Sequence, residues 1–270
     1  MAVDMGSLFM RSLGELRVQP TRKRVRAKID GETIVDSSRA VLVWEPKRVV
    51  PAYAVPVEDV VGGTRPTSDP SEWDGRDYSR IPVWDPRVPF AVRTTAGRPV
   101  AVGPDERPVA GFIAEDADLG GYVVLDFDGF DTWLEEDEEI ISHPHDPFSR
   151  IDIRDSSARY QLALDGEPVV DTTRARILFE TGLPPRHYVP RGDVLVDLAP
   201  SSATSTCAYK GVATYHSPII DGHPVEGLVW SYESPLSDGE GVRGRLCFFD
   251  ERMDVTIDGV ALPRPKTYWS

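Results

Sequence analysis

The chain has little cysteine and no long apolar segment. Its 270 residues include two cysteines, Cys207 and Cys247. A small secreted scaffold needs more disulfides than these allow, and a chain of this length can bury enough apolar surface to fold without them. No apolar run approaches the length that crosses a bilayer. The N-terminus carries Asp4 where a signal peptide carries basic residues. These features predict a cytoplasmic protein with reduced thiols.

Basic residues are also scarce, since 30 Lys and Arg face 44 Asp and Glu and the net charge is −14. Binding to nucleic acid or to an anionic membrane requires a basic surface, so we expect neither partner. Residues 1–28 are an exception, with seven basic residues and two acids. We interpret this N-terminal region as a basic arm that packs on an acidic body; a nucleic-acid-binding arm is the alternative.

The sequence contains none of the common motifs for phosphate, dinucleotide or metal binding. It has no glycine-rich phosphate loop, no Gly-x-Gly-x-x-Gly and no Gly-x-Ser-x-Gly elbow. His143 and His145 lie in an acidic loop, and the other three histidines are scattered without the spacing of a zinc site. We therefore predict no metal site, and the sequence identifies no cofactor and no oligomeric state.

An internal repeat organises the chain. Residues 25–45 and 160–180 both contain Asp-Gly-Glu, then Val-Asp, then Arg-Ala, and both end in Glu. Tyr53 and Tyr188 are paired by the same offset, and each precedes a Val-Pro-x-x-Asp-Val segment. A run of matches this long indicates two copies of one domain. The predicted organisation is a basic arm (1–23), a first repeat (24–142), a linker (143–149), a second repeat (150–262) and a C-terminal tail (263–270).

The local patterns predict an all-β, mainly antiparallel fold made of two tandem compact domains. Asp30-Gly31 and Asp165-Gly166 each separate two β-prone runs, which is the strongest short-range signal for a hairpin. The 24 prolines and 22 glycines are spread along the chain and leave little room for long helices. The stretch 115–146 holds twelve acids and no Lys or Arg, which is typical of a linker or a solvated rim.

The second repeat holds the densest cluster of reactive residue types. Cys207 lies three residues before Lys210, the only lysine between residues 48 and 265. A nearby cation favours the thiolate, so Cys207 is a candidate nucleophile and Lys210 a candidate base or nucleophile. The alternative is that Cys207 is a small buried apolar residue and that the Lys210 stem packs along apolar surface.

Aromatic and charged residues of the second repeat also predict a ligand pocket. Aromatic rings with Lys and Arg suit a planar or anionic ligand, whereas aromatics on strands often form core and the charges can form ion pairs. The predicted ligand-binding residues are Arg174, Glu180, Tyr188, Tyr209, Lys210, Tyr215, Trp230 and Tyr232.

Several of these segments resemble a known family. The runs 171–180, 188–194, 206–215 and 230–235 resemble the domain-of-unknown-function family 427 over nearly all of the second repeat. The resemblance implies a compact β-rich fold. A nucleotidyltransferase-like activity is sometimes ascribed to this family, but the chain lacks the Gly-Ser and paired-Asp pattern of such enzymes.

The first repeat is predicted to be a degenerate copy. It keeps Arg39, Glu45, Tyr53 and Asp59, but its sequence places Trp73–Tyr78 and then Trp84 where the Cys-x-Tyr-Lys-Gly run is expected. Three functions follow as hypotheses. The first is a binding module for a small polar or anionic ligand in the second repeat. The second is a small-molecule enzyme that uses Cys207 or Lys210. The third is an interaction scaffold whose acidic rim meets a basic partner.

Overall fold

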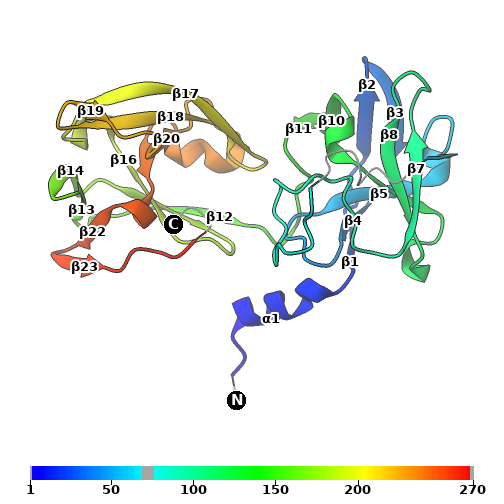
Figure 1. Ribbon diagram of the computed structural model, residues 1–270, viewed down its shortest axis with the longest axis horizontal. Helices are drawn as coiled ribbons and strands as arrows, with labels where there is room; N and C mark the ends of the chain where they lie inside the picture. The colour runs from blue at the N-terminus through cyan, green and yellow to red at the C-terminus, as the bar shows by residue number, and fades with distance from the viewer. Residues whose placement is uncertain (1, 68–75, 268–270) are drawn as a thin grey trace. The chain divides into compact units, whose positions relative to one another are not determined.

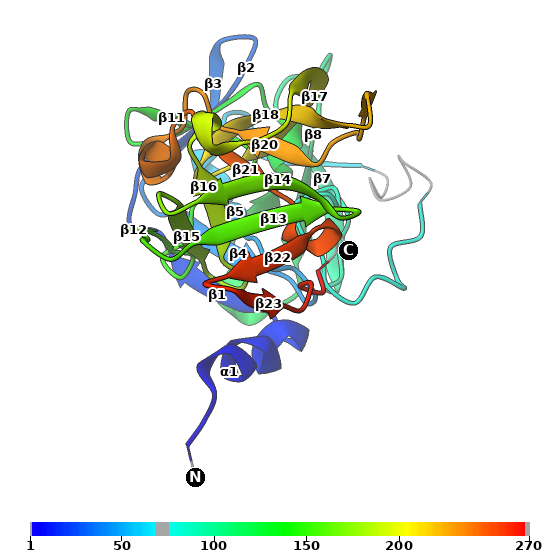
Figure 2. The same cartoon turned by 90° about the vertical axis from the view of Figure 1, so that its left-hand side faces the viewer.

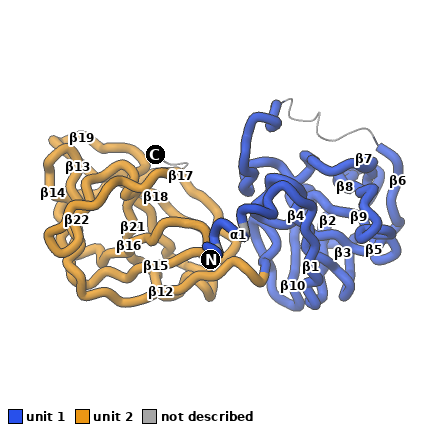
Figure 3. The backbone as a smooth tube through the Cα atoms, turned by 90° about the horizontal axis from the view of Figure 1, so that it is seen from below, with its two compact units in different colours: residues 1–146 blue, residues 147–270 orange. Residues whose placement is uncertain are grey.

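The computed structural model describes residues 2–67 and 76–267. The chain divides into two compact units, residues 1–146 and 147–270 (Figure 3). The predicted linker, 143–149, spans this division, and the finer domain limits stay a prediction. Among the described residues, no helix is both long and apolar enough to cross a membrane.

The first unit contains a seven-stranded sheet and a four-stranded sheet, both antiparallel (Figure 1). It begins with helix α1 (Met5–Arg11), whose first turn is capped by Asp4. The larger sheet has the order β1 (Arg17–Pro20), β4 (Val41–Trp44), β5 (Ala52–Pro56), β9 (Tyr122–Leu125), β8 (Val109–Ala114), β7 (Gly97–Val102) and β6 (Arg65–Pro66). The smaller sheet has the order β11 (Glu138–Ile140), β10 (Thr132–Glu135), β2 (Val25–Ile29) and β3 (Glu32–Ser37). Strand β1 thus forms within the segment that the sequence assigns to a basic arm.

The second unit has an eight-stranded and a four-stranded antiparallel sheet. The larger sheet runs β12 (Ile151–Asp155), β15 (Arg176–Glu180), β16 (Arg186–Val189), β21 (Leu246–Phe248), β20 (Val229–Ser231), β18 (Gly211–Ile220) and β17 (Leu198–Cys207), with β19 (His223–Pro224) paired to β18. The smaller sheet, in full view in Figure 2, runs β14 (Glu167–Thr172), β13 (Tyr160–Leu164), β22 (Asp254–Ile257) and β23 (Val260–Leu262).

The two units share one topology. The strand orders of the larger sheets match position by position once the extra strand β19 is set aside, and those of the smaller sheets match when one order is given from its other end. Short 3-10 helices interrupt the strands of both units, and η7 (Ser237–Val242) is the longest in the second. The prediction of an all-β, mainly antiparallel fold is confirmed.

The two Asp-Gly pairs form the predicted hairpin turns. Asp30 and Gly31 have φ of 49° and 82°, and Asp165 and Gly166 have φ of 51° and 88°. Two successive residues in the left-handed region give the turn whose twist matches that of the flanking strands, and Gly adopts it without steric penalty. The turns join β2 to β3 and β13 to β14.

The larger sheet of the second unit is buried on both faces. Successive residues of a strand point to opposite sides. Val189 and Val229 belong to the core between the two sheets, whereas their neighbours Tyr188 and Trp230 belong to a separate cluster on the other face. Val242 of η7 also packs in that second cluster. Four of the five predicted aromatic residues therefore sit on the face that points away from the four-stranded sheet, namely Tyr188, Tyr215, Trp230 and Tyr232.

The close packing around Gly97, the first residue of β7, leaves no space for a side chain. A methyl group on Gly97 would lie 2.4 Å from the Ile113 carbonyl oxygen and 2.6 Å from the Phe112 ring. Because neither group can move without disturbing the sheet, we expect Gly97→Ala to lower the free energy of unfolding by about 1–3 kcal/mol. Gly192→Ala is the control, since that position has open space. Urea unfolding of both variants measures the difference, and equal stability of the two would contradict this packing.

Candidate functional site

Four of the predicted aromatic residues gather on one face of the larger sheet in the second unit. Tyr188, Trp230 and Tyr232 are buried in one apolar cluster, and Tyr215 packs against it. The indole Nε1 of Trp230 donates to the Tyr188 hydroxyl at 3.2 Å, and Tyr215 and Ser205 hydroxyls are 2.9 Å apart. Burial raises the pKa of both Tyr188 and Tyr232. These rings are packed against one another rather than spread around a cavity.

Lys210 and Glu180 form an ion pair beside this cluster. Glu180 ends β15, and Lys210 lies in the three-residue turn from β17 to β18. Their side chains are only 9% and 16% exposed. The Lys210 carbonyl accepts from the Leu236 amide at 3.1 Å, and a methyl group at Gly239 would lie 3.2 Å from the Lys210 Cα. The turn that carries Lys210 is therefore held on both sides.

The remaining predicted residues of this turn and the second thiol lie nearby. Tyr209 is buried directly before Lys210, and Cys207, half-buried, ends β17 opposite Gly211. Cys247 is fully buried on β21, and its burial raises the pKa of its thiol. Both cysteines are free. The thiol at Cys207 is thus the more accessible of the two.

Arg174 lies apart from the other predicted residues. It precedes β15, while Glu180 ends that strand, so about 20 Å of extended chain separates the two. Arg174 pairs with Asp193, which also accepts from the Thr172 hydroxyl at 2.5 Å. The first unit repeats this arrangement with Arg39, Asp59 and Ser37, whose hydroxyl donates to Asp59 at 2.7 Å. The structure therefore divides the predicted set between two places.

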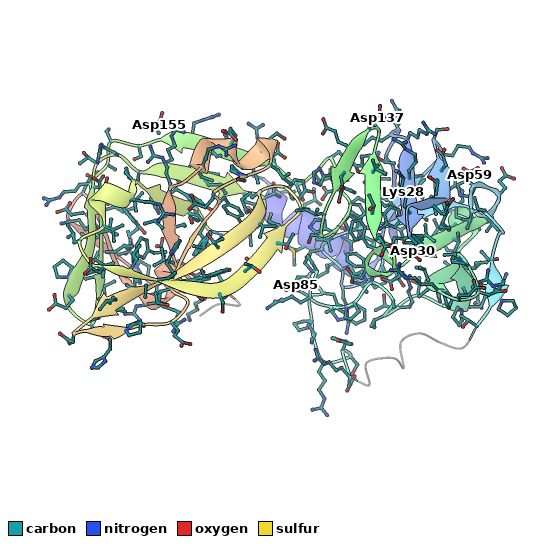
Figure 4. The ribbon with its side chains drawn as sticks, turned by 90° about the horizontal axis from the view of Figure 1, so that it is seen from above. Lys28, Asp30, Asp59, Asp85, Asp137 and Asp155 are labelled. Carbon is teal, nitrogen blue, oxygen red and sulfur yellow. The ribbon has the colours of Figure 1, made fainter. Side chains whose placement is uncertain are left out.

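A cleft of about 420 Å³ opens beside Arg174. Its lining comes from the end of β12, the turn before β15 and the residue before β21: Asp155, Ser156, Ser157, Thr173, Arg174, Ala175 and Arg245. Asp155 is labelled in Figure 4 at the surface of the second unit and pairs with Arg176. Arg245 was not among the residues predicted from the sequence, because β21 reaches this edge only through the strand order of the sheet.

Arg245 is the least compensated cation of this cleft. Its Nη1 donates to the Arg174 carbonyl at 2.8 Å, and none of the described carboxylates lies within ion-pair distance of it. Burial and the positive charges of Arg176 and Arg174 lower the pKa of the Arg245 guanidinium. Arg245 therefore brings to the cleft a positive charge that none of the described ion pairs neutralises.

A polar cluster that the sequence analysis did not identify lies on β18 and β20. Ser231 donates to Glu233 at 2.7 Å, Arg191 pairs with Glu233, and His216 Nε2 is 3.3 Å from the Ser231 hydroxyl. Burial lowers the pKa of His216. Ser231 is completely buried and directs its proton to Glu233 rather than to His216, so this arrangement is not that of an activated nucleophile.

The strand register corrects two pairings made from the sequence. Leu42 and Ile177 are equivalent positions of the repeat. Tyr53 lies opposite Leu42 and His187 lies opposite Ile177, so the counterpart of Tyr53 is His187 and not Tyr188. The second unit is therefore one residue shorter than the first before β16, and not after Tyr188. The second correction concerns the degenerate run of the first repeat. Residues 67–96 connect β6 to β7 there, where the second unit has a three-residue turn.

This long connection places different residues at the end of the first unit's sheet. Strands β7 and β18 can be matched residue by residue through their partner strands, β8 and β20. When this match is continued towards the start of each strand, Arg93–Thr95 take the positions of residues 209–211. Trp73–Gly75, in the run predicted to fill that place, lie outside the described residues. Glu45, the counterpart of Glu180, is buried and accepts from Arg93 Nη1 and from the Thr94 and Thr95 amides, each at 3.1 Å. The first unit thus keeps a paired carboxylate, but its cation, Arg93, lies at the position of Tyr209, one residue before the position of Lys210.

More buried charge surrounds this pair. Arg48 donates to the carbonyls of Val88 and Val92, and burial lowers the pKa of Arg48 to about 10. Burial, together with the charge of Asp128, raises the pKa of Asp126 to about 6. Within the parts of the chain that the structure describes, no group of three His, Cys, Asp or Glu residues is placed to hold a metal ion.

The Glu180–Lys210 pair predicts a stability change. Lys210→Met leaves Glu180 buried without its cation, and we expect the free energy of unfolding to fall by about 3 kcal/mol. Adding Glu180→Gln to this variant should recover most of the lost free energy of unfolding, because the uncompensated charge is then absent. Arg243→Met is the control, since its partner Glu240 is 57% exposed and such pairs contribute less than about 1 kcal/mol. If Lys210→Met and Arg243→Met are equally stable in urea unfolding, the pair has no such role.

Asp126 predicts a pH dependence. A carboxyl with a pKa of about 6 in the folded protein and 3.8 in the unfolded chain favours folding most below pH 4. Its contribution then declines until the pH passes 6. We expect Asp126→Asn to raise the free energy of unfolding by up to about 3 kcal/mol at pH 7.5 and by little at pH 4. Urea unfolding at both pH values measures this, with the exposed Asp118→Asn as control. A gain of equal size at both pH values would exclude the assignment.

No curated protein matches the chain. The model of one family, described as a domain of unknown function (DUF427), matches residues 17–83 and 152–259. These two segments cover well over half of the chain and fall in different units, as expected for tandem copies. The chain therefore belongs to the DUF427 family.

Proposed function

We propose that the second unit binds a small anionic ligand in the cleft between Arg174 and Arg245. The observation that carries this proposal is the position of Arg245, a partly buried guanidinium that lines the cleft without a paired carboxylate among the described residues. The proposal keeps the small-molecule partner and the cytoplasmic location predicted from the sequence. It moves the binding residues from the aromatic cluster to the opposite end of β15.

The charges around the cleft support an anion. Arg174, Arg176 and Arg245 meet there with Asp155 and Asp193, which leaves one net positive charge in a chain of net charge −14. Because the neighbouring guanidinium groups disfavour the charged form of Arg245, a bound anion would relieve their repulsion. Charge-assisted hydrogen bonds from Arg to an oxyanion are among the strongest in proteins.

The uncharged lining suits oxygen atoms of a ligand. Ser156, Ser157 and Thr173 contribute three hydroxyl groups to the same cleft. Hydroxyl and guanidinium donors together are suited to a phosphate or carboxylate group. The first unit lacks this combination, because the counterpart of Arg245 is Tyr122, whose hydroxyl donates to the Arg39 carbonyl at 3.3 Å. The proposed activity therefore belongs to the second copy.

The surroundings of Lys210 favour a role in stability over a role in ligand binding. Glu180 already neutralises the ammonium group, and the pair is buried beside packed aromatic rings. A ligand would have to displace Glu180 before it could use Lys210, whereas Arg245 requires no displacement of a carboxylate. We therefore assign Lys210 to the stability of the second unit and Arg245 to binding.

Titration calorimetry with inorganic phosphate tests the proposal. We expect the parent to bind phosphate and Arg245→Gln to bind it at least about tenfold more weakly, because one charge-assisted contact is lost. Arg243→Gln removes the same charge two residues away and does not line the cleft, so it should keep parental affinity. Citrate in parallel titrations distinguishes a carboxylate ligand from a phosphate. Equal affinity of Arg245→Gln and parent for both anions would refute the proposal.

A further inference from the structure

The first unit contains a second cleft, of about 320 Å³, within the connection that has no counterpart in the second unit. It is lined by basic residues from two parts of the chain and by two aromatic rings: Lys47, Arg76, Arg93, Tyr78 and Trp84. Asp77 is the one carboxylate in the described lining. Asp85, labelled in Figure 4, follows Trp84 and pairs with Arg87 away from the lining. The cleft is therefore basic inside an acidic unit.

Arg93 is the residue that points to a ligand. Its side chain is only 7% exposed, and its Nη1 contacts Glu45 at 3.1 Å. Its other two nitrogens, Nε and Nη2, have no hydrogen-bond partner among the described residues. The Phe112 ring lies 5.4 Å from the guanidinium carbon and replaces those hydrogen bonds only weakly. A buried donor without a partner is destabilising, and such groups often mark a binding site.

The neighbouring carboxylates do not accept hydrogen bonds from Nε and Nη2 of Arg93. Asp126 acts on it electrostatically but is not within ion-pair distance. Glu45 Oε1 accepts from the Thr94 and Thr95 amides and from the Thr95 hydroxyl, and Glu45 Oε2 accepts from Arg93 Nη1 alone, so Glu45 leaves Nε and Nη2 of Arg93 without an acceptor. An oxyanion brought by a ligand would supply the acceptors that the fold does not.

We propose that this cleft binds a small organic anion, with its oxyanion group at Arg93 and its apolar part against Tyr78 and Trp84. The two rings are 6.3 Å apart at an interplanar angle of 67°, so they form an angled apolar wall. Lys47 lies 5.8 Å from the Trp84 ring and donates to the Ser79 carbonyl, which fixes its charge at the same wall. This site lies in the other unit and does not depend on the cleft at Arg245.

The experiment uses the full chain carrying Arg245→Gln, so that phosphate binding in the second unit does not contribute. Phenyl phosphate and inorganic phosphate are titrated calorimetrically. We expect phenyl phosphate to bind, and to bind several-fold more tightly than inorganic phosphate, because its ring contacts the apolar wall. Added Arg93→Gln should weaken phenyl phosphate binding about tenfold, as one charge-assisted hydrogen bond is lost.

A second variant covers the case in which Arg93→Gln fails to fold. Arg76 is exposed at the cleft, and Arg76→Gln should weaken binding about two- to threefold without unfolding the unit. Arg80→Gln is its matched control, since Arg80 is exposed and lies outside the lining. No binding of phenyl phosphate in the Arg245→Gln background would overturn the proposal. Equal weakening by Arg76→Gln and Arg80→Gln would overturn it too, because it would indicate only a general charge effect.

Discussion

A buried carboxylate at the end of one strand is the interaction on which both units depend. Glu45 follows β4 and Glu180 ends β15, and each is withdrawn from water. A carboxylate in such a place is stable only when a cation and hydrogen bonds compensate its lost hydration. In both units the cation, Arg93 or Lys210, comes from the connection that leads into the far half of the larger sheet. The pair therefore ties the second strand of the larger sheet, β4 or β15, to the connection that enters the sixth strand, β7 or β18.

The face of the larger sheet that points away from the smaller sheet is covered differently in the two units. In the second unit it carries Tyr188 and Trp230, which fill the space themselves with help from η7. In the first unit the equivalent positions are Ala54 and Phe112, so less volume is filled from within the sheet. The long connection into β7 supplies the missing cover, and Arg93 from this connection lies over the Phe112 ring. The loss of aromatic bulk and the insertion are thus two parts of one change.

This compensation explains how much the sequence could predict. Periodic patterns and the Asp-Gly pairs are local, so they identified the all-β fold and both hairpins. The repeat in residues 25–45 and 160–180 was visible because the strands in these segments begin at the same spacing in both units. The position of Arg93 was not, because an insertion of about 27 residues moves it out of alignment and only the strand register restores it.

The candidate site was predictable only in part, for a similar reason. Arg174 and Lys210 were selected from one run of motifs, but a strand's length separates them in space. Arg245 was overlooked because its neighbour Arg174 lies 71 residues earlier and reaches it through a crossover of the sheet. Pairing across a sheet depends on strand order, which a single sequence does not display.

The comparison of two copies separates charges that serve the fold from charges that serve binding. Arg24 pairs with Asp36 as Arg159 pairs with Asp171, each through two hydrogen bonds. A pair present at equivalent positions of both copies belongs to what the two units have in common. Arg245 has no such equivalent in the first unit, where Tyr122 makes the same contact to the backbone without a charge. The fold therefore needs only a donor at this position, and this backbone contact does not require the positive charge of Arg245.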